Sequence, residues 1–506
     1  MKKRNRIAAV LLAALLLLPL AVHTAAAVGE EQPYAYNFDV QKNPLPCPSP
    51  YEVRYRIDPG ALGSTKLKNP QGMFVRNDAL YLADTGNNRI LQFTLTETEP
   101  TFLREIRQGE GWSLSAPEDV FADEDGTLYI ADTGNRRVLL LDKELNLLRE
   151  ITRPDSAAFD TGEFKPQKLV ATAGGRIYLQ AAGVNKGLVE FNADGSFSGY
   201  LGASPVSFNF TDYIWKRYFS TDAQRAQLAS FVPTEYNNVA LDREGFLFVT
   251  TATFDVDDLN SEKVETVRRL NLKGKNILIS NDERIIGDYT WTQEKGPSRF
   301  TDVTVLDNDV YYVLDATRNR IFAYDNQGFS LYVFGGYGTR SGYFQSPTAL
   351  EHWGRDLLVL DSTSGLVTVM KETSYGSAIS SAIENYNSGL YEASFSDWQE
   401  VLRRNGNYRF AYDGIGKIML RNGDYQQALA YLKYARDAYY YSKAWKLYRK
   451  DWIERNLIYI VLGIGALVLT LTVVRVIRKE KEALRVYEKR RRDIASGGTD
   501  AEGLGV

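Results

Sequence analysis

The sequence predicts a mainly β fold, a six-bladed β-propeller, followed by an α-helical module and one transmembrane helix. Three observations lead to this prediction. A unit of short apolar runs separated by turn residues recurs six times, beginning at Pro70, Pro117, Pro166, Tyr236, Phe300 and Pro347. The pattern becomes helical after Glu372, and residues 457–474 are apolar and uncharged. The chain has 506 residues, which is enough for more than one domain.

Residues 1–27 have the pattern of a signal peptide. Basic residues crowd the first six positions, the run 7–20 is almost wholly apolar, and Ala25-Ala26-Ala27 offers a small-residue cleavage site. An uncleaved N-terminal anchor is the alternative, although the run is short for a membrane span. We expect residues 28–50 to be a linker that leads into the propeller, residues 51–376.

Each of the six units is expected to form four antiparallel strands. Its runs are rich in Val, Ile, Leu, Tyr and Phe, and turn sequences such as "DEDG" and "DTGN" separate them. Six such sheets arranged around one axis make a propeller. The segment 51–57 precedes the first unit, and we expect it to supply the outer strand of the last blade and close the ring. The aromatic-rich insertion 198–235 could contact a partner or cover the joints between blades.

One phrase recurs almost unchanged: "YLADTGNNRI" at 81–90, "YIADTGNRRV" at 129–138 and "YVLDATRNRI" at 312–321. These units resemble the NHL repeat, over about residues 51–372. We expect the phrase to build the blade, with direct ligand contact as the alternative. The carboxylate would accept N–H bonds in the turn, the glycine would permit a positive φ, and the arginine would reach neighbouring carboxylates. The residues concerned are Asp84, Gly86 and Arg89 in the first unit and Asp132, Gly134 and Arg137 in the second.

The resemblance implies that the first strand of each unit lines a central channel. Six loops would then converge at its mouth on a rigid frame, which is a usual place for a binding site. The predicted ligand- or partner-binding residues are Gln71, Glu118, Gln167, Asn237, Asn238, Asp302 and Thr348. A one-residue change of register would turn Asp119 and Lys168 inward instead of Glu118 and Gln167.

A metal is the alternative to a solvated polar pore without a cofactor. Glu118, Asn238 and Asp302 are oxygen ligands of the kind that Ca²⁺ or another divalent metal prefers, and the arrangement resembles the gluconolactonase-like six-bladed lactonases. Beyond residue 28 the chain has only His352, which excludes sites with two or three histidine ligands. A Ser-His-Asp triad would also need His352, which we expect to be a packing or surface residue.

The residues after the propeller predict helices and a membrane anchor. In the helical module, residues 377–455, Gly389 and Tyr391 recur 34 positions later as Gly423 and Tyr425, a spacing that resembles tetratricopeptide repeats. The run 456–475 suits a transmembrane helix, and the basic tail 476–506 favours the cytoplasmic side. With an export signal, the large N-terminal part would lie outside the cell membrane.

Together these features predict a bacterial, membrane-anchored extracytoplasmic protein that binds rather than catalyses. Its partner would be a protein or a glycan. Residues 28–456 carry 47 Lys and Arg against 57 Asp and Glu, a net charge of about −10 that does not resemble that of a nucleic-acid-binding protein. The alternative is a metal-dependent lactonase-like hydrolase with its site at the propeller pore. A signalling role would require the short tail to recruit a cytoplasmic partner.

Overall fold

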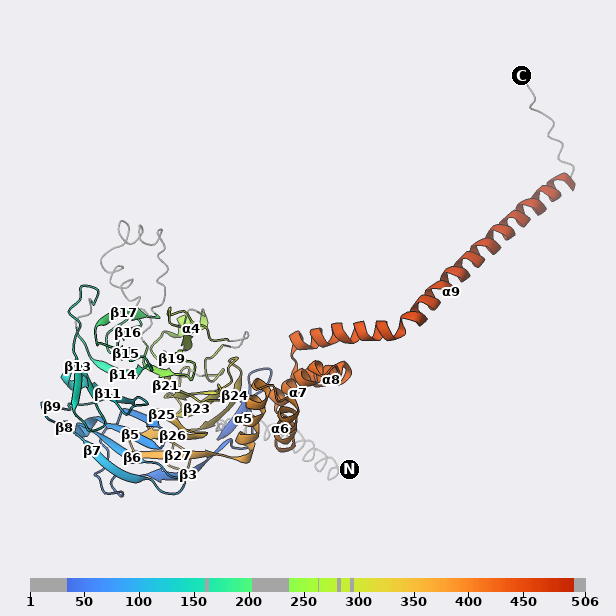
Figure 1. Ribbon diagram of the computed structural model, residues 1–506. Helices are drawn as coiled ribbons and strands as arrows, with labels where there is room; N and C mark the ends of the chain where they lie inside the picture. Colours follow the sequence, from blue (N-terminus) through green and yellow to red (C-terminus); the bar gives the residue numbers. More distant parts are fainter. Residues whose placement is uncertain are drawn as a thin grey trace, which may run out of the picture. The chain divides into compact units, whose positions relative to one another are not determined.

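The computed structural model describes residues 34–159, 163–202, 236–262, 264–279, 284–291 and 295–495 (Figure 1). The predicted signal peptide 1–27, most of the insertion 198–235 and the end of the basic tail lie outside the described residues. The chain divides into two compact units at Ala411 and Tyr412. The first unit holds all the strands.

Six antiparallel sheets follow one another along the chain, which confirms the six-bladed propeller. Blade one is β4 (Gly72–Arg76), β5 (Ala79–Asp84), β6 (Arg89–Thr94) and β7 (Thr101–Ile106). Blade two is β10 (Asp119–Ala122), β11 (Leu128–Asp132), β12 (Arg137–Leu141) and β13 (Leu147–Ile151). Blade three is β14 (Pro166–Ala171), β15 (Ile177–Ala181), β16 (Leu188–Phe191) and β17 (Phe197–Leu201).

The remaining blades continue the same order. Blade four is β18 (Asn238–Leu241), β19 (Leu247–Thr250) and β20 (Val267–Leu270). Blade five is β21 (Phe300–Val305), β22 (Tyr311–Asp315), β23 (Arg320–Tyr324) and β24 (Ser330–Gly335). Blade six is β25 (Pro347–Trp353), β26 (Asp356–Asp361), β27 (Leu366–Glu372) and β3 (Tyr51–Ile57). Outside the blades lie the short pair β8 (Gln108–Gly109) and β9 (Trp112–Ser113) and the one-turn helix α4 (Val256–Asn260).

Blade four has three strands in the described residues, where we expected four. After β20 the chain makes a single bridge between Leu270 and Asn276. The Asn276 side-chain oxygen accepts hydrogen bonds from the backbone N–H groups of Arg269, at 3.1 Å, and Leu278, at 3.0 Å. The Ile277 N–H also donates to the Arg269 carbonyl at 2.7 Å. Residues 276–278 therefore bond β20 partly through the backbone and partly through the Asn276 side chain, in place of a regular fourth strand.

The ring closes as predicted. β3, from the start of the propeller, pairs antiparallel with β27 at its end, with Tyr51 opposite Glu372 and Ile57 opposite Val367. The expected linker 28–50, in contrast, contains two strands, β1 (Ala35–Phe38) and β2 (Pro44–Pro46). β1 extends blade five by pairing with β24, so this segment belongs to the propeller. Its short runs carry too little periodicity to identify strands from sequence.

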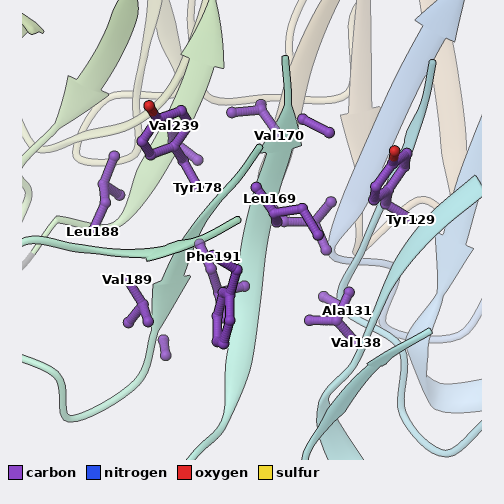
Figure 2. Close-up of a cluster of buried hydrophobic side chains, with 14 of the residues drawn as sticks. Tyr129, Ala131, Val138, Leu169, Val170, Tyr178, Leu188, Val189, Phe191 and Val239 are labelled. Atoms are coloured by element: carbon purple, nitrogen blue, oxygen red, sulfur yellow. The ribbon is translucent and has the colours of Figure 1, made fainter. Parts of the chain in front are cut away.

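The core lies between the faces of neighbouring blades. Figure 2 shows the cluster that joins blades two, three and four, where Val138, Leu169, Phe191 and Val239 are all buried. Alternate residues of each strand point to opposite faces of the sheet, so each blade contributes to two such clusters. At roughly 1.5–3 kcal/mol for each large apolar side chain that is buried, these clusters are the main stabilisation of the ring.

The repeated phrase forms a buried ion-pair turn. In blade one, Asp84 accepts hydrogen bonds from the backbone N–H of Lys68 at 2.7 Å and from the Arg89 Nε at 2.7 Å, and Arg89 also reaches Glu105 at 2.7 Å. In blade two, Asp132 and Arg137 form the corresponding pair at 2.8 Å. The turn therefore ties the second and third strands of a blade to the segment before its first strand.

The prediction that Gly86 and Gly134 are needed for a positive φ is wrong. Neither residue has a positive φ, because each lies in a short 3₁₀ turn, η1 (Thr85–Asn87) or η2 (Thr133–Asn135). The residues with a left-handed backbone are Asn88 and Arg136, two positions after each glycine. Glycine is needed because a Cβ on Gly86 would lie 2.5 Å from the carbonyl oxygen of Lys68, and a Cβ on Gly134 would lie 2.6 Å from that of Ser115.

Five helices follow the ring: α5 (Ser374–Asn387), α6 (Tyr391–Arg404), α7 (Arg409–Arg421), α8 (Tyr425–Ala435) and α9 (Ala438–Ala495). Thr373 caps α5 by accepting from the Gly376 N–H. α5 packs on blade six, where the Ser380 hydroxyl donates to Glu372 of β27 at 2.5 Å. In the described part of the chain, α9 is the one helix long and apolar enough to cross a membrane.

Candidate functional site

A pocket of about 540 Å³ occupies the central channel, and the first strand of every blade lines it. The pocket extends from the first residues of these strands to the hairpins that connect each first strand to the second. Its volume lies in the range of small-molecule sites. Because six strands from one closed ring hold it, its walls are set by the propeller rather than by flexible loops.

Four polar residues at the starts of the first strands form one end of the pocket. They are Asp119 of β10, Lys168 of β14, Asn238 of β18 and Asp302 of β21. The Lys168 ammonium group donates to the Gln71 carbonyl of blade one at 3.0 Å and lies 3.8 Å from Asp119. The Lys168 side chain therefore extends from blade three past blade two and contacts blade one. We call these four residues the channel floor.

The two floor aspartates also join neighbouring blades. Asp302 accepts from the Leu350 N–H of blade six at 2.8 Å and from the Asn238 amide of blade four at 2.5 Å. Asp119 accepts from the Leu169 N–H of blade three at 3.0 Å. Gly72 takes the corresponding place in blade one, where a Cβ would lie 2.6 Å from the Asp119 carboxylate. A small residue there allows blades one and two to approach.

Burial shifts the ionisation of both floor carboxyl groups. Desolvation raises the pKa of Asp302 to about 7 and that of Asp119 to about 6, and the nearby Lys168 ammonium only partly offsets it. Glu351 raises both pKa values further through its own charge. Two carboxyl groups whose charge changes near neutral pH therefore face the same pocket.

Blades five and six contribute a polar wall made of Thr304, Glu351 and His352. The Thr304 hydroxyl lies 3.1 Å from the Glu351 Oε1 and 2.7 Å from the His352 Nδ1. Burial opposes the charged imidazolium, but the hydrogen bond and the charge of Glu351 outweigh it, so the pKa of His352 is raised. Both partners contact the same ring nitrogen, Nδ1, so the three residues do not form a relay in which a base activates a hydroxyl through its second nitrogen.

Blades one and two contribute an aromatic wall. The rings of Phe74 and Phe121 lie 4.6 Å apart, and the Arg76 guanidinium lies 5.3 and 5.4 Å from them. The Arg76 Nε donates to the Ala122 carbonyl at 3.0 Å, which fixes the side chain over the rings. Val170 and Ala240 of blades three and four continue this apolar side. At this level of the channel the side chains of blades one to four are thus apolar, and those of blades five and six, Thr304 and Glu351, are polar.

The residues predicted for the channel mouth divide between two places. Asn238 and Asp302 lie in the channel floor. The others are not part of the pocket lining, because they precede the floor residues in each strand. Gln167 donates to Glu118 at 2.9 Å, Asn237 donates to the Thr301 carbonyl at 3.1 Å and Thr348 donates to the Pro70 carbonyl at 3.1 Å. Gln71 donates to the Asn69 side chain at 3.0 Å.

The three predicted metal ligands, Glu118, Asn238 and Asp302, do not lie together in one site. Asn238 and Asp302 bond each other, whereas Glu118 lies outside the pocket lining and accepts from Gln167. Among the residues that the structure describes, no group of three or more His, Cys, Asp or Glu residues is arranged to hold a metal ion. Binding of Ca²⁺ at the pore stays a prediction.

Sequence reasoning did not identify Phe74, Arg76, Thr304 or Glu351, and it treated His352 as a packing or surface residue. A signal was available. Side chains two apart in a strand share a face, so an inward Asp302 also turns Thr304 inward, and the corresponding positions in blades one and six are Phe74 and Glu351. These residues were missed because the sequence left open, by one residue, which side chains of each first strand face the channel.

Comparisons with known proteins add little. No protein-family model matches the sequence, and no curated protein sequence matches it. Virginiamycin B lyase from Staphylococcus aureus is 10% identical over 64% of this chain and 100% of its own, with a TM-score of 0.38. A protein described as a gluconolactonase is 13% identical over 65% of this chain and 94% of its own, also with a TM-score of 0.38. At these scores the likeness carries no argument, and the six-bladed assignment rests on the strand pairing itself.

Proposed function

We propose that this chain is a single-pass membrane protein whose extracytoplasmic propeller binds a protein or glycan partner. The observation that carries the binding role is the channel pocket, which brings charged, aromatic and apolar side chains from all six blades to one place. A binding role needs a rigid frame and a shaped cavity, and the closed ring supplies both. The helical module would present a second surface.

The membrane anchor is supported by the composition of α9. Residues 457–474 of this helix are uncharged and apolar, and a dense group of Lys and Arg follows them. Trp445 and Trp452 are about half exposed and precede the run, where amphipathic rings suit a membrane interface. With the N-terminal export signal, the basic tail would be cytoplasmic and the propeller outside.

The finer assignments belong to the same proposal. An NHL-like repeat is supported by the matching turns at Asp84 and Asp132. A tetratricopeptide-like pair is supported by the matching helix starts at Tyr391 and Tyr425, each two residues after a left-handed glycine. Ser394 and Ala428, at equivalent positions of α6 and α8, are both fully buried, as small residues between packed helices should be.

Photo-crosslinking in intact cells tests the binding role. A benzophenone amino acid placed at Glu124, an exposed residue at the pocket rim, should give a discrete crosslinked product. The matched control places the same group at Leu148, which is 56% exposed on the outer strand of blade two. Identical products from both positions, or no product from Glu124, would contradict a partner at the channel.

The metal-dependent hydrolase remains the alternative function. It would require Asp302 and Asn238 to give up their mutual hydrogen bond and Glu118 to turn toward the pocket. A bound divalent ion would polarise an ester carbonyl and lower the pKa of water. The binding role needs no such rearrangement, and we therefore prefer it.

A further inference from the structure

The channel pocket has an excess of acidic groups over basic ones. Seven acidic residues line it, namely Asp119, Asp123, Glu124, Asp242, Asp302, Asp307 and Glu351, against the basic residues Arg76, Lys168, Arg243 and His352. Arg243 pairs with Asp309 at 2.9 Å and Asp242 pairs with Arg269 at 2.5 Å, so these two charges are already balanced. Lys168 keeps its charge, because the Gln71 carbonyl that it bonds is neutral, and the remaining acidic residues still outnumber the basic ones. A narrow cavity lined mainly by one sign of charge concentrates ligands of the opposite sign.

Glu351 is the carboxylate best placed to meet a ligand. Its Oε1 accepts from the Thr304 hydroxyl and from the His352 backbone N–H at 3.0 Å, and these bonds fix the side chain. Within the described part of the chain, its contacts all use Oε1, so Oε2 is available. Glu351 also lines the pocket, next to Thr304 and His352.

The opposite wall can accept the apolar part of such a ligand. Phe74 and Phe121 form an aromatic pair with the Arg76 guanidinium beside it, and Val170 and Ala240 add apolar surface at the same level of blades three and four. An ammonium group facing Glu351 and Asp302 would leave its carbon skeleton against this wall. A hydrated divalent metal would gain nothing from that side of the pocket.

We propose that the channel pocket binds a small organic cation, an amine with an apolar or ring-shaped body, whose ammonium group lies between Glu351 and Asp302. The inference rests on the proposed binding function and names the ligand class of its pocket. A free amino sugar and a small aliphatic or quaternary amine share this chemistry. Neutral sugars and carboxylic acids would be excluded, the first for lack of charge and the second by repulsion.

Isothermal titration calorimetry of the full chain in detergent tests this, with glucosamine and choline as probes. At least one of them should bind at pH 7, where both carry a positive charge, whereas glucose and N-acetylglucosamine, which lack the charge, should not. Loss of a hydrogen bond to a charged group should make binding about 10- to 100-fold weaker in Glu351→Gln. Glu144→Gln, an exposed outer residue, should bind as the unchanged protein does.

A second measurement uses the unchanged protein, so it does not depend on whether a Glu351 variant folds. Because an ammonium group favours ionised Asp302 and Asp119, binding at pH 6.5 should release protons, seen as a difference in binding heat between phosphate and MES buffers, neither of which is a net cation. The proposal is overturned if neither amine binds at 10 mM or if N-acetylglucosamine binds as well as glucosamine. It is also overturned if Ca²⁺ binds and the amines do not. A partner crosslinked at Glu124 together with no amine binding would refute this inference while leaving the proposed function intact.

Discussion

Substitution of Gly86 by alanine tests why the repeated turn contains glycine. The structure puts a new Cβ 2.5 Å from the Lys68 carbonyl oxygen and 2.8 Å from the Lys68 Cγ. The Gly86 N–H donates to the same carbonyl at 2.8 Å, so moving the two backbones apart also weakens a hydrogen bond. Overpacking costs about 1–3 kcal/mol and a hydrogen bond about 1 kcal/mol. Alanine also lowers the conformational entropy of the unfolded chain relative to glycine, which offsets about 0.4–1 kcal/mol of this cost.

The expected net loss for Gly86→Ala is therefore about 1–3 kcal/mol. The matched control is Gly174→Ala, in the hairpin between β14 and β15, because a Cβ there has its nearest neighbour at 3.9 Å and the residue has no positive φ. Thermal unfolding of both full-length variants, followed by circular dichroism, should show a lower midpoint for Gly86→Ala and an unchanged or slightly higher one for Gly174→Ala. Equal midpoints would refute the close-approach explanation.

Two further predictions concern buried charges. Arg89→Ala leaves Asp84, which is fully buried, without its ion partner, and should cost about 3–5 kcal/mol. Arg176→Ala removes a half-exposed arginine from its pair with Glu190 and should lower the unfolding midpoint much less. Equal losses in thermal unfolding would contradict the buried network. Because burial raises the pKa of Asp302 to about 7, the folded chain favours the protonated carboxyl, so the contribution of this group to stability is greatest below its unfolded pKa and is lost as pH rises toward 7. Asp302→Asn should flatten the decline in unfolding midpoint between pH 4 and pH 8, and an unaltered profile would show that Asp302 does not titrate in this range.

The sequence predicted the propeller because its two signals are local. Alternating apolar residues identify strands, and the six recurring units, three of which carry the nearly unchanged phrase, identify the number of blades and their boundaries. Closure by residues 51–57 followed from the same count, since the last unit lacked an outer strand. The strands of residues 35–46 were missed because β1 and β2 have four and three residues and their pairing to blade five is set by the tertiary fold.

The candidate site was only partly predictable for a different reason. Asp302 and Asn238 were identified because polar residues at strand starts stand out, but the wall formed by Thr304 and Glu351 joins strands 47 residues apart. A shift of one residue exchanges the two faces of a strand, and the sequence did not fix that register. Gly86 shows the same limit, because its constraint comes from the backbone at Lys68, a neighbour that the phrase itself does not contain.

Cysteine labelling in intact cells tests the membrane arrangement, on which the proposed function depends. Burial raises the pKa of the Cys47 thiol to about 12, so it should react slowly, and Cys47→Ser removes it entirely. In that background, Glu144→Cys reports on the propeller and Lys489→Cys on the basic end of α9. The account predicts that a membrane-impermeant maleimide labels the first in intact cells and the second only after permeabilisation. Labelling of the second alone in intact cells would contradict an extracytoplasmic propeller.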